Sequence, residues 1–226
     1  MRVGLIDGLA ELLFPTRCAG CEMPGAVLCD RCRANLPRVE PAGACPSCGA
    51  PFGHLVCTEC WSREWAFEAA VAVGSLEAPL ARAVVLHKDA GERRLAAVFG
   101  ALLAEQVALV WPGWPECVAY VLATAVAQRR RGFDHGRAIA ASLCAELGIP
   151  LAEALRRTAA RDQRALGRAE RAVNAAGTFH AIGDVRGRVL LCDDVFTTGA
   201  TLDAAATALL SAGVEAVRVA VVARAW

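Results

Sequence analysis

The pattern of apolar positions changes near residue 62. Before this point apolar runs are short and interrupted by Cys, Pro and Gly, whereas after it apolar runs of strand length alternate with segments of helical spacing. The second part predicts strands at 67–73, 118–122, 189–192 and 217–222, and helices at 79–87, 92–110, 136–147 and 200–210. Strand, helix and strand in this order imply parallel pairing, so we expect an α/β domain there.

Two further segments have a weaker pattern. Residues 1–14 indicate a short amphipathic helix, because Asp7 and Glu11 interrupt the apolar run. Residues 156–177 are rich in Arg and Ala and fit either a mobile loop or an exposed helix. We therefore divide the chain into 1–62, a short helix and a small module that needs a metal to fold, and 63–226, the α/β domain.

The cysteines of the N-terminal part are paired. Eight of the eleven cysteines lie between residues 18 and 60 as four Cys-x-x-Cys knuckles, Cys18/Cys21, Cys29/Cys32, Cys45/Cys48 and Cys57/Cys60. Two knuckles supply the four thiolates of one tetrahedral zinc site, so four knuckles predict two structural Zn²⁺ sites. Redox pairs or an iron–sulfur cluster are the alternatives. Consecutive knuckles give the simplest pairing, and a crossed pairing stays open.

The paired cysteines and the distribution of apolar residues also indicate the cellular compartment of the protein. The chain has no run of eighteen apolar residues and no signal peptide, so we expect no membrane span and a reducing, cytoplasmic location, where paired cysteines more often hold metal than form disulfides. Cys117, Cys144 and Cys192 lie in apolar settings and are expected to be core residues.

Two adjacent carboxylates, Asp193 and Asp194, follow the predicted strand at 189–192 and precede a turn that opens a helix. Free backbone N–H groups at such a turn bind phosphate, and carboxylates accept hydrogen bonds from the vicinal hydroxyls of ribose. A pair of Asp residues alone also fits a Mg²⁺ site, a phospho-acceptor site or a helix cap. The predicted ligand-binding residues are Asp193, Asp194, Val195, Thr197, Thr198, Gly199, Ala200 and Thr201.

Arginine is concentrated in one region although the whole chain is nearly neutral, with a formal net charge of +1. Between residues 129 and 171 arginines outnumber acidic residues, and Phe133 is the aromatic residue among them, so no base-stacking platform is evident. The excess fits the pyrophosphate of a small ligand, a nucleic-acid backbone or a solvated face. Candidate pyrophosphate or polyanion contacts are Lys88, Arg131, Arg137, Arg168 and Arg171; His87 and His135 are further candidates for phosphate contact.

The stretch Val189 to Leu202 resembles the fingerprint of type I phosphoribosyltransferases. Together with the cysteine knuckles it resembles the ComF family, as do Leu86-His87-Lys88, Arg131-Gly132-Phe133, Gln163 with Leu166, Arg168 with Arg171 and Asn174, and Gly177-Thr178-Phe179. The resemblance implies a type I phosphoribosyltransferase-like parallel sheet with an N-terminal double zinc ribbon. It also implies phosphoribosyl pyrophosphate with Mg²⁺ as the ligand, and a link to DNA uptake in natural transformation.

The chain departs from that family at two places. A Val-Pro-Val-Pro-like segment, which resembles the pyrophosphate loop of the enzymes, is replaced by Ala119-Tyr120-Val121-Leu122, and the usual Asn-Gln by Asp134-His135. Without the two prolines, turnover does not follow from the motif.

Two functional hypotheses result. The first is a phosphoribosyltransferase, a pentosyl-transferring glycosyltransferase, with Asp193 and Asp194 as catalytic residues. The second is a non-catalytic competence component that binds single-stranded DNA, works with DNA-uptake proteins and uses the site as a nucleotide-sugar sensor.

Overall fold

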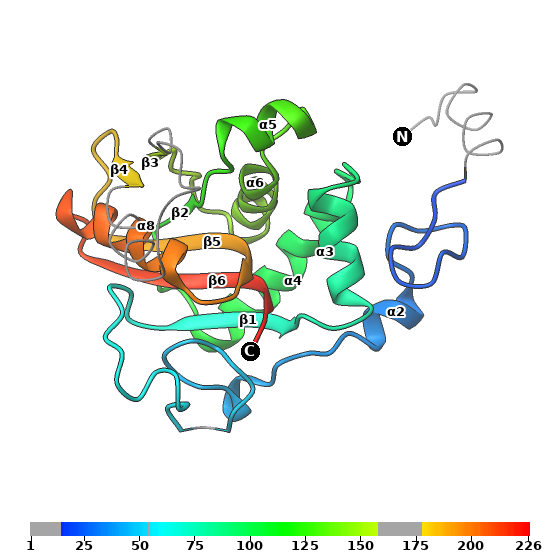
Figure 1. The fold of residues 1–226 in the computed structure, drawn as a ribbon, viewed down its shortest axis with the longest axis horizontal. Coiled ribbons are helices and arrows are strands. Elements are labelled where there is room, and N and C mark those ends of the chain that lie inside the picture. Colours follow the sequence, from blue (N-terminus) through cyan, green and yellow to red (C-terminus); the bar gives the residue numbers. More distant parts are fainter. Residues whose placement is uncertain (1–14, 54, 158–177) are drawn as a thin grey trace, which may run out of the picture.

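The structure, a computed structural model, describes residues 15–53, 55–157 and 178–226. Its centre is a parallel four-stranded sheet with the strand order β1-β6-β5-β2 (Figure 1). The strands are β1 (Ala70–Ser75), β2 (Cys117–Tyr120), β5 (Arg188–Phe196) and β6 (Ala216–Arg224). Parallel strands in a sheet of this kind need helical crossovers, which place helices on both faces.

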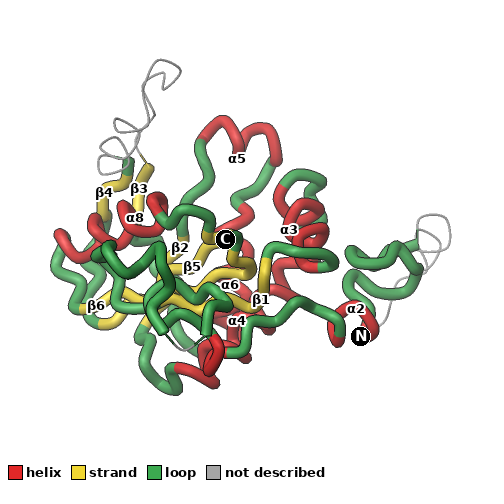
Figure 2. Tube along the Cα trace, turned by 60° about the horizontal axis from the view of Figure 1, so that its bottom comes forward, coloured by secondary structure: helices red, strands yellow, loops and turns green. Residues whose placement is uncertain are grey.

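The helices lie on both faces of this sheet. One face is covered by α3 (Leu80–Lys88), α4 (Leu95–Val110) and α6 (His135–Leu147), and the other by α8 (Ala200–Ser211). A small antiparallel pair, β3 (Leu155–Arg157) and β4 (Phe179–Ala181), packs on α8. Figure 2 shows that α5 (Ala125–Arg131) stands away from the sheet on two loops. None of the described helices has the length and apolar character to span a membrane.

Successive residues of the strands point into two different hydrophobic cores. In β5, Val189 and Leu191 face the core under α8, while Leu190 and Cys192 face the core under α3, α4 and α6. All four side chains are fully buried. Burial on both faces explains why the strand sequences are continuous apolar runs without alternation.

The cysteine-rich part lies on both sides of the sheet. Residues 45–60 join the α8 core, because Cys45, Cys48, Cys57 and Cys60 are buried there beside Phe67. Residues around α2 (Asp30–Ala34) lie beside α3, where Ala19 and Leu36 join the other core (Figure 1).

The segment between these two regions runs along the β1 edge of the sheet and includes a short 3₁₀ helix, Pro41–Gly43. In this segment Val39 N–H donates to Val73 O over 3.1 Å, and Pro37 O accepts from Ser75 N–H over 2.8 Å. At the opposite edge, Ala152 N–H donates to Val118 O over 2.7 Å. Both edge strands therefore have irregular backbone hydrogen-bonded to them.

The predicted α/β fold is confirmed, as are the four strands of the sheet and the four helices that cover it, with shifted ends. Strand β1 is 70–75 rather than 67–73, and β5 runs on to Phe196, so Asp193 and Asp194 lie inside the strand. Helix α5 and the β3/β4 pair were not predicted. The boundary at 62/63 stays a prediction, and the segments 1–14 and 158–177 lie outside the described residues.

Candidate functional site

A cavity of about 400 Å³ opens at the carboxyl end of the sheet, where ligands bind in folds of this type. It is enclosed by the last part of β5, the loop after β2, the end of α3 and the start of α6. Its polar lining consists of Lys88, Thr124, Arg131, His135, Arg157, Asp193, Asp194, Thr197 and Thr201. The cavity therefore combines two carboxylates with three cationic side chains, Lys88, Arg131 and Arg157.

The two adjacent carboxylates at the cavity differ in their partners. The Asp194 Oδ2 atom lies 2.7 Å from Lys88 Nζ and 3.3 Å from His135 Nε2. The Asp193 Oδ1 atom accepts a hydrogen bond of 2.8 Å from the backbone N–H of Asp194. Both residues are buried, Asp193 to 8% exposure and Asp194 to 3%. Both residues are buried because β5 continues beyond its apolar run to Phe196, so that they lie within the sheet.

These surroundings separate the pKa values of the pair. Burial raises the pKa of Asp194, but the hydrogen bond from His135 and the charge of Lys88 outweigh it, so the pKa lies below the ordinary value. Burial and the charge of Asp194 both raise the pKa of Asp193 well above its ordinary value. The arrangement thus has one firmly ionised carboxylate and one that holds its proton more readily.

The segment 197–201, here called the phosphate loop, connects β5 to α8. Gly199 is the N-cap of α8 and has φ 75° and ψ −8°, a left-handed conformation that suits glycine. A Cβ atom at Gly199 would lie 2.5 Å from Cη2 of Trp65, so no other residue fits without a shift. The first N–H groups of α8 have no partner within the helix, and they are suited to bind an anion.

Helix α6 approaches the loop after β2, residues 121–124, very closely. A Cβ atom at Gly136 would lie 2.6 Å from Val121 O, so the absence of a side chain allows this contact. Asp134 caps α6 by accepting from Arg137 N–H over 3.1 Å, and its other oxygen accepts from Ala123 N–H over 3.4 Å. The Asp found here in place of the family's usual Asn therefore serves as a helix cap that also holds the loop.

Two arginines border the cavity from different elements. Arg131, at the end of α5, has Nη1 3.3 Å from His135 Nδ1 and donates from Nη2 to Asp89 Oδ1 over 3.0 Å. Arg157, in β3, donates to Leu122 O over 3.2 Å, and burial lowers its pKa while the charge of Asp193 raises it. Arg157 was not predicted from the sequence, because no motif marks a three-residue strand.

The other predicted contacts lie in different places. Lys88 and Arg131 line the cavity, but Arg137 is half-exposed, pairs with Glu153 over 2.9 Å and does not line it. His87 is fully buried between Glu92 O and His135 O, 3.1 and 3.4 Å from its ring nitrogens, and also does not line the cavity. Arg168 and Arg171 lie outside the described residues. Of the predicted ligand-binding residues, Asp193, Asp194, Val195, Thr197 and Thr201 line the cavity.

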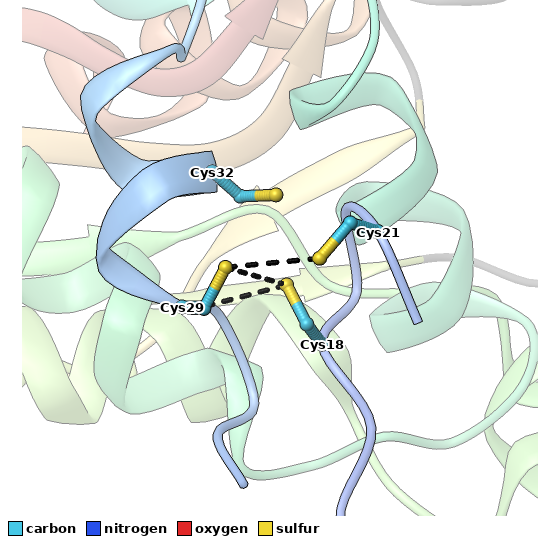
Figure 3. Close-up of side chains that lie close together, drawn as sticks. All are labelled: Cys18, Cys21, Cys29 and Cys32. Carbon is cyan, nitrogen blue, oxygen red and sulfur yellow. Dashed lines mark hydrogen bonds between the residues drawn. The ribbon is translucent and has the colours of Figure 1, made fainter. Parts of the chain in front are cut away.

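The eight knuckle cysteines form two groups. The first cysteine cluster is Cys18, Cys21, Cys29 and Cys32, and the second is Cys45, Cys48, Cys57 and Cys60; within each, the sulfur atoms lie within 4.8 Å of one another. Figure 3 shows the four side chains of the first cluster pointing toward one another, two from a loop and two from the start of α2. Consecutive knuckles therefore pair, and the crossed arrangement is excluded.

The chemistry of both cysteine clusters fits zinc, since four sulfur atoms are the ligand set of a structural zinc site. Backbone N–H groups point at the sulfurs, with 3.3 Å from Cys29 N to Cys18 Sγ and 3.3 Å from Cys57 N to Cys45 Sγ. Burial raises the pKa of Cys18, but the backbone N–H groups of Cys29, Cys21 and Gly20 lower it to about 6, whereas burial and the neighbouring sulfur atoms raise the pKa of Cys32 to about 12. Cys18 is therefore the thiol of this cluster that ionises first.

Comparison with known proteins assigns the class. The family model described as "Phosphoribosyl transferase domain" matches residues 133–225, which contain both carboxylates, the phosphate loop, β5, β6 and α8. The fold is therefore that of a type I phosphoribosyltransferase, with a parallel sheet and a cavity at the carboxyl ends of its strands.

The chain is also similar to curated proteins over nearly its whole length. The chain is 29% identical over 222 residues to the protein named "DNA utilization protein YhgH" from Salmonella typhi, covering 92% of this chain and 96% of the relative. The protein of the same name from Escherichia coli strain K12 is 29% identical over 221 residues, with the same coverage. The chain thus combines a phosphoribosyltransferase domain and two cysteine clusters with similarity to these relatives over nearly its whole length, the combination by which it resembles the ComF family.

Solved structures also match. The glutamine phosphoribosylpyrophosphate amidotransferase from B. subtilis aligns with 22% identity and a TM-score of 0.42, over 57% of this chain and 26% of that chain. The orotate phosphoribosyltransferase from Aeropyrum pernix aligns with 22% identity and a TM-score of 0.36, over 64% of each chain.

Proposed function

We propose that the cavity binds the ribose 5-phosphate part of phosphoribosyl pyrophosphate. The observation that carries this proposal is the junction of β5 and α8, where two buried carboxylates stand beside a glycine-opened helix N-terminus in one cavity. The loop would bind the 5-phosphate through N–H groups and the hydroxyls of Thr197, Thr198 and Thr201. The carboxylates of Asp193 and Asp194 would accept hydrogen bonds from the two ribose hydroxyls.

The cationic side chains of the cavity suit the rest of this ligand. Lys88 and Arg131 border the cavity at the side of α3 and α5, where a pyrophosphate group would need charge neutralisation. The cavity also contains atoms that could coordinate a metal ion: one from each of Asp193, Asp194 and His135, all within 4.8 Å of one another. Mg²⁺ prefers carboxylate oxygen, so the two Asp residues are those that would hold it near the ligand, where it would neutralise phosphate charge.

A catalytic role would use the same residues. In pentosyl transfer, pyrophosphate leaves C1 of the ribose as a nitrogen base attacks, and the sugar passes through an oxocarbenium-like state. Asp193 and Asp194 would hold the ribose in position and stabilise its positive charge, which is a contribution from orientation and electrostatics. The segment 119–122, at the end of β2 and the start of the following loop, lacks the prolines of the family pattern, so binding without turnover is the second form of this proposal.

The relatives' name, DNA utilization protein, supports a role in handling DNA. The resemblance to the ComF family extends this proposal to DNA uptake, in the cytoplasm and together with DNA-uptake proteins. The observation that favours single-stranded DNA as a further partner is the row of arginines at the end of α5, where Arg130 has a side chain 71% exposed beside the cavity. A DNA backbone bound by several such residues would give strongly salt-dependent affinity.

Calorimetric titration tests the binding proposal. Phosphoribosyl pyrophosphate with Mg²⁺ is added to the wild type, to an Asp193→Ala, Asp194→Ala double variant and to Asp184→Ala, which removes an exposed carboxylate outside the cavity. We expect binding by the wild type and by Asp184→Ala, and none by the double variant. Absence of heat with the wild type would refute the site.

Two further measurements separate the roles. Pyrophosphate release on addition of individual nucleobases would establish turnover, and its absence despite binding would favour the sensor. The arginine row is tested by measuring the affinity for single-stranded DNA at two salt concentrations, with the wild type and an Arg129→Ala, Arg130→Ala double variant. Equal affinity of the two proteins would exclude these arginines as a DNA-binding site.

A further inference from the structure

Two side chains connect the second cysteine cluster to the phosphate loop. We propose that this cluster, when it holds its metal, positions the loop through Arg224 and Trp65, so that affinity for a sugar phosphate depends on metal at a site outside the cavity. The proposal rests on the proposed ribose 5-phosphate site. It assigns Arg224 and Trp65 as positioning residues, since neither lines the cavity.

Arg224, at the end of β6, is buried to 1% exposure between the loop and the cluster. Its Nη1 donates to Thr197 O over 2.8 Å and to Phe196 O over 3.2 Å. Its Nη2 donates to Glu59 Oε2 over 3.1 Å and lies 3.8 Å from Cys48 Sγ. One guanidinium therefore holds the base of the phosphate loop with one nitrogen and reaches the cluster with the other.

The planarity of the peptide bond makes these contacts relevant to ligand binding. In a trans peptide the C=O of one residue points opposite to the N–H of the next. Arg224 binds the carbonyl of Thr197, and Arg63 donates to the carbonyl of Thr198 over 3.1 Å. The N–H groups of Thr198 and Gly199 consequently point away from these arginines. Fixing the carbonyls thus orients the donors that a phosphate would need.

Trp65 forms the second connection. Its indole N–H donates to Cys60 Sγ over 3.3 Å, and its ring packs against Gly199, where it would clash with any Cβ atom. The ring also stacks on Phe67 with centroids 5.1 Å apart and meets Phe196 edge-on at 5.6 Å. The hydrogen bond to Cys60 thus fixes the indole N–H end of Trp65, and the opposite side of the ring restricts the position of Gly199 in the phosphate loop.

Metal binding would strengthen the Arg224 connection by a change of charge. The guanidinium is buried, and among the described residues its Nε has no hydrogen-bond partner. Its acidic partner in this part of the chain is Glu59, whose side chain is 66% exposed. Zinc binds cysteine as thiolate, and four thiolates around one Zn²⁺ leave a net negative charge. Arg224 would then face a negative centre, and the hydrogen bond to Cys48 would join a cation to a thiolate.

The first cluster provides an internal control, because it contacts a different element. There Arg82 of α3 donates to Gly20 O over 3.3 Å and pairs with Glu22. Cys18 and Cys45 are equally buried, each begins the first knuckle of its cluster, and each accepts a backbone N–H. Ser substitutions at these two positions therefore remove equivalent ligands from the two clusters.

The experiment titrates ribose 5-phosphate calorimetrically into the zinc-loaded full chain, Cys18→Ser and Cys45→Ser, with zinc content measured on each protein. We expect both variants to lose one zinc. Affinity should fall about tenfold or more in Cys45→Ser and stay within about twofold in Cys18→Ser, because only the former releases the loop. Arg224→Met should weaken binding similarly while both zinc ions remain.

Trp65→Phe covers the case in which these variants fail to fold by circular dichroism. It keeps a ring beside Gly199 but removes the N–H donor to Cys60, and we expect about threefold weaker binding with both zinc ions retained. Unchanged affinity in the folded Cys45→Ser, or in Trp65→Phe when Cys45→Ser does not fold, overturns the coupling while the binding site stands. Absence of ribose 5-phosphate binding by the wild type overturns the site itself.

Discussion

Asp193 and Asp194 are neighbours in sequence, yet they meet different electrostatic environments. Asp194 has Lys88 and His135 within 3.3 Å, whereas Asp193 has a backbone N–H and the charge of its neighbour. Without a ligand, the negative charge of Asp193 lowers the free energy of unfolding. Ribose hydroxyls would donate hydrogen bonds to this carboxylate and offset part of the destabilisation, which links the stability of the free protein to the function of the site.

The first prediction concerns this cost and its pH dependence. A raised carboxyl pKa means that ionisation destabilises the fold, so the cost is absent below the unfolded pKa of about 3.9, grows as the pH rises above it, and is full above the folded pKa. Asp193→Asn should therefore stabilise the free protein at pH 7 by about 1 kcal/mol or more. Urea unfolding at pH 7 and pH 4.5 should show a larger gain at pH 7.

Asp184→Asn is the control for this measurement, since its exposed carboxylate should give little change at either pH. A loss of stability in Asp193→Asn at pH 7 would contradict the prediction.

The second prediction concerns Gly199, whose conformation and packing both exclude a side chain. Gly183 has a similar φ of 74° but open space around its Cα, so Gly183→Ala isolates the backbone strain. We expect Gly183→Ala to cost about 1 kcal/mol and Gly199→Ala about 3 kcal/mol, because the latter adds the clash with Trp65. Urea unfolding of both variants measures the difference in unfolding free energy. Equal losses of stability would show that the Trp65 ring moves aside without destabilising the fold.

At the scale of elements, the N-terminus of α6 organises the loop after β2. Asp134 is one residue with two tasks: its carboxylate caps the helix at Arg137 N and holds the loop at Ala123 N. The close contact of Gly136 with Val121 O fixes the same loop from the helix side. The loop after β2 is thus held by a helix cap and by the close approach of a glycine.

The third prediction follows from this cap. Asp134→Ala should cost about 1 kcal/mol in unfolding free energy, the usual effect of removing an N-cap. Asp134→Asn keeps one acceptor oxygen for the helix cap but places an NH2 donor where the other oxygen accepts from Ala123 N–H, so we expect a smaller loss than in Asp134→Ala. Thermal or urea unfolding of the two variants tests this order, and a loss in Asp134→Asn as large as in Asp134→Ala would contradict it.

Regular elements with long apolar patterns could be predicted from sequence, and short ones could not. The strand at Val189–Cys192 and the helix from Ala200 are marked by buried runs and a glycine turn. Strand β3 has three residues, and its apolar Leu155 precedes two arginines, which resembles a charged loop. The extension of β5 through Asp193 and Asp194 could not be predicted either, because polar residues normally end a buried strand.

The candidate site shows the same limit. Asp193, Asp194 and the phosphate loop are contiguous in sequence and form a recognisable motif. Lys88 and His135 were candidates from the sequence and join the cavity from α3 and α6. Arg157 joins it from β3 and was not predicted, because a single sequence carries no distance information. Arg137 looked equivalent to Arg131 in the charge pattern, but its position on α6 directs it to Glu153.

At the scale of the whole molecule, the two cysteine clusters stabilise opposite faces of one sheet. The second cluster is part of the core under α8, and the first lies against α3 beside the other core. Metal at these places would contribute folding energy to both cores at once.

The fourth prediction is that the protein contains two zinc ions and depends on them for stability. Removal of both with a chelator should lower the melting temperature by roughly 10 °C or more, and added Zn²⁺ should restore it. Metal analysis and calorimetry provide the measurements. A metal-free protein with an unchanged melting temperature would show that the cysteines pack as ordinary core residues.

The segment that joins the two clusters also determines how the protein behaves when it loses metal. Residues 37–39 form backbone hydrogen bonds with Val73 and Ser75, and the Gln106 side chain donates to Ala72 O over 3.0 Å. This part of the β1 edge is therefore not available for pairing with another strand. An unpaired edge is a template for aggregation between chains. Because residues 37–39 are held between the clusters, zinc depletion should free the edge, and self-association through β1 would be the first visible sign of metal loss.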